Sequence, residues 1–279
     1  MATGLKIDEI GYWSEVKLDI LKDYAKPYNT ILCKHRLKPI YIDGFAGAGH
    51  HKAKRSDRLI DGSPKRALDV QPPFEALHFV DMDDARIQEL RRLSEGRKSV
   101  YIHHGDCNSI LIEKVFPTVR RNRYQRALCI LDPYGLHLDW KVIQAAANTK
   151  AIEIFLNFPV ADMQRNVFWR NYERVDIADR ERMTRFWGDG TWEDAAYQTS
   201  PSLFGDMKEK TDIKIVVEAF RERLKKIAGF QYVPEPIPMR NSKGAIVYYL
   251  FFAAHDRTAG KIVSDIFKKY EHKGEVDYV

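Results

Sequence analysis

A glycine-rich turn carries the clearest chemical signal in the sequence. Residues 43–49 read Asp-Gly-Phe-Ala-Gly-Ala-Gly and follow the apolar run at 40–42. Glycines in such a turn adopt positive φ and let the backbone pass close to a ligand. Open α/β sheets bind ligands where a strand ends. The sequence therefore predicts a cofactor site here, formed by Asp43, Gly44, Phe45, Ala46, Gly47 and Gly49.

Two features refine this prediction. The aspartate at the start of the turn can accept hydrogen bonds either from a ligand ammonium or from backbone amides. The glycine spacing differs from the Gly-x-Gly-x-x-Gly of dinucleotide binders, which argues against a dehydrogenase. The turn is similar to the S-adenosylmethionine loop of amino-group methyltransferases, although a His/Lys/Arg stretch follows it where those enzymes begin a helix.

Acidic residues end the next two apolar runs. Asp81, with Asp83 behind it, follows 76–80, and Asp106 follows 100–103. A carboxylate at the first position can accept the ribose hydroxyls of a cofactor, and one at the second can accept from an adenine amino group. The alternative for each is a solvated strand end. Adjacent side chains at 103 and 104 point to opposite faces of an extended backbone, so we predict no metal site there.

The tetrad Asp132-Pro133-Tyr134-Gly135 closes a fourth apolar run, 127–131. The Asp132 side chain and a backbone carbonyl can accept the hydrogens of a target amine and aim its lone pair at a methyl group. The Tyr134 ring can stack on a base, which such enzymes often flip out of its helix. The tetrad resembles the Asp-Pro-Phe-Gly of tRNA guanine-N2 methyltransferases. The alternative is a turn that merely ends a strand.

Strands that alternate with helices predict a parallel α/β sheet wound on both faces. Two C-terminal strands, 230–239 and 245–254, predict an antiparallel hairpin, so the architecture is that of Rossmann-like methyltransferases. We expect one domain, with a helix in 1–36 that Ser14 caps, a cofactor-binding core in 37–160, a helical insertion or lid in 161–210, and a C-terminal helix, hairpin and last helix in 211–279. A short helix after Gly62 is expected to have Ser63 as its cap and Pro64 in its first turn.

Composition narrows the range of functions. The chain has 279 residues and a net charge of +6, which is compatible with a nucleic-acid partner. The basic residues beside the glycine turn are predicted phosphate contacts, with a solvated loop as the alternative: Lys52, Lys54, Arg55 and Arg58. Three scattered cysteines argue against a disulfide framework. The sequence has neither a membrane-length apolar run nor a signal peptide at its start, so we expect a cytoplasmic protein.

The pattern as a whole resembles the three-Cys-motif partner family. The matching residues are Trp13-Ser14, Lys17-Leu18, Leu21, Tyr24, Tyr28, the turn 43–47, 62–64, 132–135, Asn157-Phe158, 186–188 and 248–250. The resemblance implies a methyltransferase-like fold and a neighbouring gene product that looks like a radical S-adenosylmethionine protein.

The leading expectation is an S-adenosylmethionine-dependent N-methyltransferase that acts on an amino group of a nucleic-acid base. A non-catalytic partner with the same fold, binding the three-Cys protein or nucleic acid, is the main alternative. A small-molecule methyltransferase is a further one.

Overall fold

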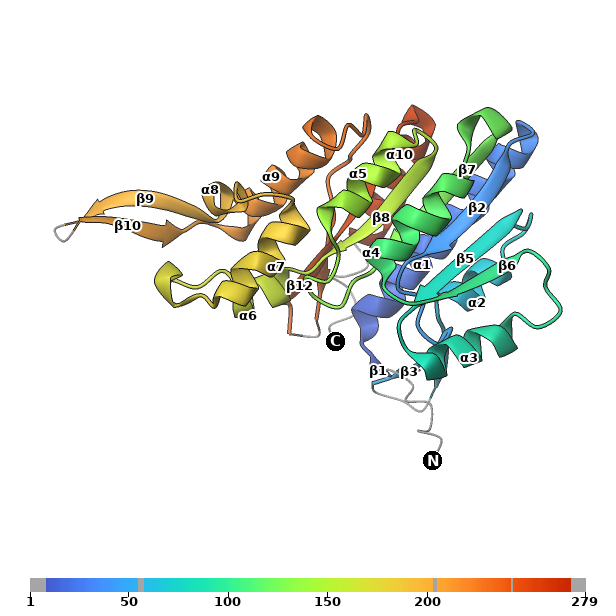
Figure 1. Cartoon of the computed structure of the whole chain (residues 1–279), viewed down its shortest axis with the longest axis horizontal. Coiled ribbons are helices and arrows are strands. Elements are labelled where there is room, and N and C mark those ends of the chain that lie inside the picture. The colour runs from blue at the N-terminus through green and yellow to red at the C-terminus, as the bar shows by residue number, and fades with distance from the viewer. Residues whose placement is uncertain (1–8, 55–57, 203–204, 242, 272–279) are drawn as a thin grey trace.

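The computed structural model describes residues 9–54, 58–202, 205–241 and 243–271. A seven-stranded sheet forms the centre of the molecule (Figure 1). Its strands, in the order in which they lie side by side, are β11 (Ile237–Arg240), β12 (Ile246–Ala253), β8 (Ile152–Phe158), β7 (Gln125–Leu131), β2 (Lys38–Asp43), β5 (Ala76–Asp81) and β6 (Val100–His104). β12 is antiparallel to both of its neighbours, β11 and β8, whereas all other neighbouring strands of this sheet are parallel. The predicted mostly parallel sheet with a C-terminal antiparallel hairpin is confirmed.

The order of the strands creates one special position. The chain begins the sheet at β2, moves outward through β5 and β6, then returns to the other side of β2 with β7 and β8. The direction of winding therefore reverses between β2 and β7. Ligands bind open α/β sheets outside the carboxyl ends of the strands at such a reversal.

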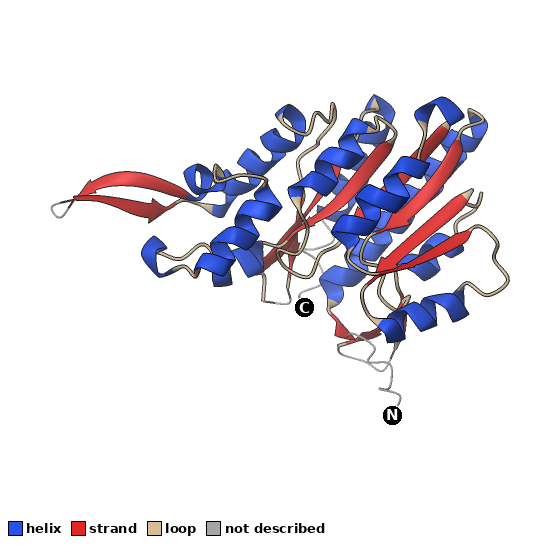
Figure 2. Ribbon diagram, in the orientation of Figure 1, coloured by secondary structure: helices blue, strands red, loops and turns tan. Residues whose placement is uncertain are grey.

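Alternating strand residues contribute to two separate cores. Ile40 and Ile42 face one of them, and Tyr41 faces the other. The first core lies under α4 (Cys107–Ile110), η1 (Leu111–Val115), α5 (Trp140–Asn148) and α9 (Ile213–Lys226). The second lies under α1 (Tyr12–Lys34), α2 (Ser63–Leu68), α3 (Asp84–Leu93) and α10 (Arg257–Glu271). Both faces of the sheet are thus covered by helices, which is why its strands read as continuous apolar runs (Figure 2).

Two expected helix caps are wrong. Gly11 precedes α1 and Gly62 precedes α2, and neither helix has a side-chain cap. The two serines are used elsewhere: the Ser63 hydroxyl bonds the Asp43 carboxylate, and the Ser14 hydroxyl bonds Tyr248. Their hydroxyls therefore join helices to the sheet instead of closing helix ends.

The basic stretch after the glycine turn is a hairpin and not a loop. Strands β3 (His50–Ala53) and β4 (Leu59–Asp61) pair antiparallel, and β1 (Glu9–Ile10) adds to β3 in parallel. This small sheet lies beside the start of α1 (Figure 1).

The insertion expected to be helical is only partly so. It contains α6 (Val160–Asn166), α7 (Ile177–Trp187) and α8 (Trp192–Ala196), followed by a hairpin of β9 (Tyr197–Ser202) and β10 (Gly205–Lys210). The hairpin projects away from the sheet at the left of Figure 1. Short helical turns at 116–118, 121–123 and 172–174 complete the chain.

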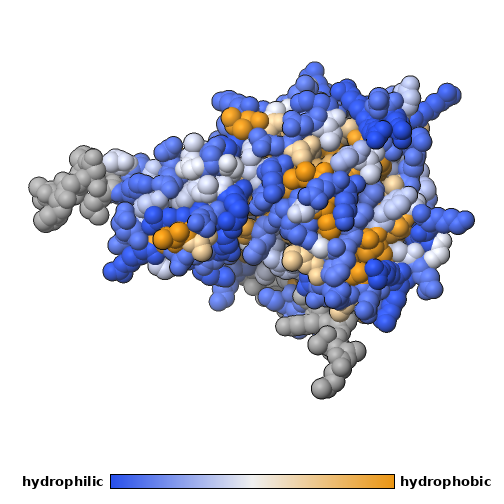
Figure 3. Space-filling view, viewed as in Figure 1, coloured by the Kyte–Doolittle hydropathy of each residue, from blue (hydrophilic) through white to orange (hydrophobic). Residues whose placement is uncertain are grey.

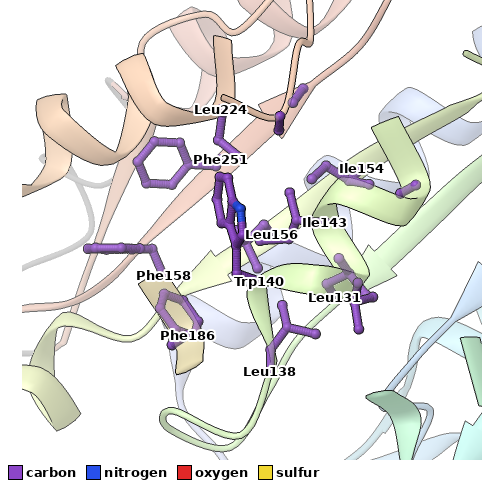
Figure 4. Packing of buried hydrophobic residues seen from close by; sticks show 14 of the residues in the cluster. Leu131, Leu138, Trp140, Ile143, Ile154, Leu156, Phe158, Phe186, Leu224 and Phe251 are labelled. Carbon is purple, nitrogen blue, oxygen red and sulfur yellow. The ribbon is translucent and has the colours of Figure 1, made fainter. Parts of the chain in front are cut away.

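Aromatic side chains join the insertion to the sheet. Phe186 of α7, Phe158 of β8 and Phe251 of β12 meet around Trp140 and Leu224 (Figure 4). Trp187 and Trp192 of the insertion are buried, whereas Trp169 is 43% exposed. The buried pair therefore belongs to the core.

The surface seen in Figure 3 is mostly hydrophilic, with scattered apolar patches. None of the helices in the described ranges is long and apolar enough to cross a membrane.

Candidate active site

A cavity of about 350 Å³ lies at the carboxyl ends of β2 and β7, where the winding of the sheet reverses. Phe45, Ala46 and Gly47 of the glycine turn line it, together with the first three residues of the 132–135 tetrad. Two motifs that are almost 90 residues apart in the sequence therefore meet in one space. Its volume lies within the range of small-molecule sites, roughly 300–1,000 Å³.

A larger hollow of about 650 Å³ lies between the start of α1, α9, β11 and the end of α10. Trp13 lines both spaces. None of the sequence-predicted site residues lines the larger one, so the chemistry is assigned to the smaller cavity.

The glycine turn is held by backbone hydrogen bonds on two sides. The Gly44 amide donates to the Ile130 carbonyl at 2.9 Å, and the Ala46 amide donates to the Val80 carbonyl at 2.9 Å. The Gly47 amide donates to Asp81 Oδ2, also at 2.9 Å. The turn is therefore fixed to both neighbouring strands before any ligand arrives.

The three glycines of the turn have different reasons to be glycine. Gly47 has φ +66°, and no heavy atom lies within 4 Å of the position that a Cβ would occupy. A Cβ at Gly49 would instead lie 2.6 Å from Leu93 Cδ2, and one at Gly44 would lie 3.0 Å from Cys107 Sγ. Gly44 and Gly49 thus serve close packing, whereas Gly47 borders open space that a ligand can fill.

Asp43 lies beneath the turn and shapes it. The side chain is 1% exposed, and Oδ1 accepts from the Phe45 amide at 3.2 Å. Burial raises the pKa of this carboxyl to about 6, while the hydrogen bond from Ser63 and the charge of Lys17 act in the opposite direction. Of the two roles expected for Asp43, the structure shows the bond to a backbone amide.

The two other predicted cofactor carboxylates end β5 and precede α4. Asp81 is 8% exposed. Its Oδ2 accepts from the Gly47 amide, and its Oδ1 accepts from the Asp83 amide at 2.9 Å. Asp83 in turn caps α3 by accepting from the Arg86 amide. Asp106 caps α4 by accepting from the Ser109 amide at 3.1 Å. Both lie outside the cavity wall in this structure, so their ribose and adenine contacts stay predictions.

The neighbouring histidines point apart. His103 Nε2 lies 3.1 Å from His78 Nδ1, whereas His104 Nε2 lies 3.0 Å from the Met82 carbonyl oxygen. Their side chains occupy opposite sides of β6, as extended backbone requires.

Asp132 is engaged by two groups that we did not assign to the site from the sequence. The Lys17 ammonium forms an ion pair with Oδ2, and Asn157 Nδ2 donates to Oδ1 at 2.8 Å. The Lys17 side chain is 11% exposed and that of Asp132 is 32% exposed. Lys17 and Asn157 also line the cavity, beside Tyr248. Both belong to the residues that carry the family resemblance, but no pattern in the sequence placed either beside Asp132.

The rest of the tetrad shapes the mouth of the cavity. The Tyr134 ring is 59% exposed, and the Arg86 guanidinium lies 5.5 Å from its centroid. Gly135 has φ +67°, and a Cβ there would lie 2.8 Å from Asp162 Oδ2. The tetrad can turn sharply here only because a glycine ends it.

Of the predicted phosphate contacts, Lys52, Lys54 and Arg58 lie at the β3–β4 hairpin, and His51 of this hairpin lines the cavity. The hairpin is therefore beside the site. Arg58 pairs with Glu15, and the Lys54 ammonium lies 5.8 Å from the Trp13 ring centroid. Lys52 lies on β3, and Arg55 falls outside the described residues. Arg58 is thus occupied within the chain.

The insertion does not cover the cavity. None of its described residues belongs to the cavity wall, which is built from β1, α1, the glycine turn, the hairpin, Ser63 of α2, Ile130 of β7, the tetrad, β8 and β12. A role as a lid over the site stays a prediction, with a plain insertion as the alternative.

No family model matches the chain, and no curated protein matches it. Several solved structures are similar to it in the path of the backbone. Protein LPL1258 of Legionella pneumophila is 11% identical over 95% of this chain and 94% of its own, with a TM-score of 0.49. The fibrillarin pre-rRNA processing protein of Methanococcus jannaschii is 11% identical over 78% and 66%, with a TM-score of 0.39. A methyltransferase of Geobacter sulfurreducens is 11% identical over 65% and 75%, with a TM-score of 0.30. At these identities and scores, they carry nothing over to the site.

Proposed function

We propose that the protein is an S-adenosylmethionine-dependent N-methyltransferase that acts on an amino group of a nucleic-acid base. One observation carries the proposal: the open side of Gly47 and the Asp132-Pro133-Tyr134 segment line one cavity, at the carboxyl ends of two neighbouring parallel strands. A methyl donor and an acceptor amine need such a shared space.

The residues around the turn suit this cofactor. The Gly47 backbone leaves room for a ligand, and Phe45 and Ala46 form the adjacent wall. Asp81 is expected to accept from the ribose hydroxyls, and Asp106 from the adenine amino group, through lone pairs that their bonds within the chain leave available. When bound, the cofactor supplies an electrophilic methyl group, whose bond to sulfur breaks with its electron pair staying on sulfur as the amine lone pair forms the new bond.

Asp132 positions the amine and stabilises the positive charge that develops on the amine nitrogen during transfer. A carboxylate offers about four lone-pair sites, and Lys17 and Asn157 use two of them. The remaining sites can accept the hydrogens of the target amine and, after transfer, one proton. Catalysis of this kind is mostly orientation of reactants, which can supply about 7–11 kcal/mol of a barrier.

A nucleic-acid substrate is supported by the surface around the cavity. The exposed Tyr134 ring at the mouth is a stacking platform of the kind that base-flipping enzymes use. Lys52 and Lys54 on the neighbouring hairpin add positive charge, and the chain carries +6 overall.

A specific observation also favours the alternative of a non-catalytic partner protein. Each Asp132 oxygen is already bonded by a side chain of this protein. A fold that no longer transfers methyl groups could retain the ion pair for stability alone and bind a three-Cys-motif radical-SAM-like protein or nucleic acid.

Transfer of a labelled methyl group to a panel of DNA and RNA, with and without such a partner, separates the two functions. We expect wild type to label a nucleic acid. Asp132→Ala should bind the cofactor but lose turnover by orders of magnitude, because the carboxylate acts mainly in the transition state. Asp265→Ala, which removes an exposed carboxylate of α10, is the control. A wild type that binds cofactor yet labels nothing would support the partner role.

A further inference from the structure

Two residues of the cavity wall have no part in the expected chemistry and yet touch its central carboxylate. We infer, on the basis of the proposed function, that Lys17 and Asn157 read the edge of the target base. Asp132 and Asn157 Oδ1 supply two hydrogen-bond acceptors, and the Lys17 ammonium beside them supplies a donor. The group that they fit is an amino group attached to a ring carbon next to a ring nitrogen.

The orientation of the Asn157 amide is fixed by its neighbour. Nδ2 must face Asp132 because only this end of the amide can donate to a carboxylate. The other end, Oδ1, is buried and has no hydrogen-bond partner among the residues that the structure describes. Buried acceptors in folded proteins are nearly always satisfied. Since Asn157 lines the cavity, a donor of the bound substrate is the natural partner of Oδ1.

Lys17 provides the matching donor. Its ammonium carries three N–H groups, and its only hydrogen bond within the described part of the chain is to Asp132. The ammonium also lies 5.7 Å from the ring centroid of Tyr248, which lines the same cavity. The remaining N–H groups are therefore available at the wall, next to the acceptor that they neutralise.

This set discriminates between classes of amine. In adenine, cytosine and guanine, the amino group donates two hydrogen bonds, and a ring nitrogen beside it accepts one. Asp132 and Asn157 Oδ1 can take the two hydrogens while Lys17 donates to the ring nitrogen. An aliphatic amine offers no such acceptor to the Lys17 ammonium. The site therefore selects a heteroaromatic amine over a lysine side chain or an alkylamine.

Deaza bases test the role of Lys17 directly, because they keep the amino group and replace the neighbouring ring nitrogen with C–H. Once the methylated base is known, kcat/KM is compared for oligonucleotides that carry the parent base or its analogue: 1-deazaadenine, 3-deazacytosine or 3-deazaguanine. We expect wild type to prefer the parent base by about 10- to 100-fold, the range for a hydrogen bond to a charged group. Lys17→Met should bring this ratio close to one, whatever its effect on absolute rates.

Matched variants separate this role from a structural one. Lys22→Met, on the exposed side of the same helix, should keep the wild-type ratio. Lys17→Gln retains a neutral donor and should give an intermediate ratio, and binding of S-adenosylhomocysteine reports that each variant is folded. Asn157→Ala should lower kcat on the parent base and on its deaza analogue alike, because Asn157 contacts the amino group and not the ring nitrogen. The ratio of kcat/KM between the two bases should therefore stay unchanged.

The outcomes are distinguishable. If wild type methylates a base and Lys17→Met keeps the full preference for the parent, the inference is overturned and the proposed function stands. If wild type transfers methyl to no oligonucleotide, both are overturned. A ratio that collapses only in the Lys17 variants supports both.

Discussion

At the scale of single residues, two carboxylates on neighbouring strands have opposite surroundings. Asp43 is buried and receives hydrogen bonds from uncharged groups. Asp132 is partly exposed and paired with an ammonium. The charge of Asp132 adds to the effect of burial in raising the pKa of Asp43, and the charge of Lys17 opposes it. The structure thus places a carboxyl that resists ionisation below the glycine turn and a paired carboxylate in the cavity wall.

The raised pKa of Asp43 predicts a pH-dependent stability. The folded protein keeps the Asp43 proton up to about pH 6, whereas the unfolded chain loses it near 3.8. The folded state binds more protons between these values, so this group lowers the free energy of unfolding as pH rises through the window. Asp43→Asn cannot ionise, and its stability relative to wild type should improve from pH 4 to pH 7 by up to about 3 kcal/mol.

Chemical denaturation across this pH range measures the effect. Asp194→Asn, which removes an exposed carboxylate of α8, is the control. A stability difference between Asp43→Asn and wild type that stays constant with pH would show that Asp43 ionises in the folded protein as readily as in the unfolded chain.

At the scale of elements, α1 does more than cover the sheet. Its buried face packs on the second core, and the Tyr24 hydroxyl donates to Glu153 Oε2 of β8 at 2.6 Å. The same helix carries Trp13 and Lys17 into the cavity. The helical pattern of this segment was predictable from its apolar spacing. Its bond to Asp132 was not, because it joins residues that are 115 positions apart.

The β3–β4 hairpin could not be predicted from the sequence, for a physical reason. Residues 50–53 read His-His-Lys-Ala, without the apolar alternation of a half-buried strand. β3 pairs with β4 on one side and with β1, which is only two residues long, on the other. A two-residue strand is too short to show an alternation of apolar and polar residues, so the sequence does not reveal β1 as the partner of β3.

The hairpin gives a prediction for nucleic-acid binding. We expect Lys52 and Lys54, which lie at this hairpin beside the cavity, to bind phosphates. Replacing both with Gln should weaken oligonucleotide binding and make its dependence on salt shallower. The logarithmic slope should fall by up to about 0.9 for each phosphate of duplex DNA that is no longer neutralised.

Binding titrations at several salt concentrations test this. Arg121→Gln with Arg123→Gln is the matched control for charge, because these residues lie in the turn at the amino end of β7, whereas the cavity lies at its carboxyl end. If the control changes the slope and the hairpin variant does not, the nucleic acid binds elsewhere.

At the scale of the whole molecule, the position of the site follows from the order of the strands. Both faces of the sheet are buried, so most of its strands appear in the sequence as apolar runs and were predictable to within a few residues. The exception is β11, which begins at Ile237 and not at the predicted Phe230. The residues that end β2 and β7 could be picked out for the same reason. The insertion was harder to predict, because the hairpin of β9 and β10 projects from the body and the sequence of its strands is mostly polar.

The proposed function requires that the open side of Gly47 holds the methyl donor. Calorimetric titration with S-adenosylhomocysteine, beside a nicotinamide cofactor, tests it most directly in wild type, Gly47→Val and Gly96→Val. Gly96 is the matched control, because it also has positive φ and open space at its Cβ but lies on the turn after α3. We predict binding of S-adenosylhomocysteine alone, lost in Gly47→Val and retained in Gly96→Val. Wild-type affinity in a folded Gly47→Val, or no binding by wild type, would contradict the assignment of this cavity.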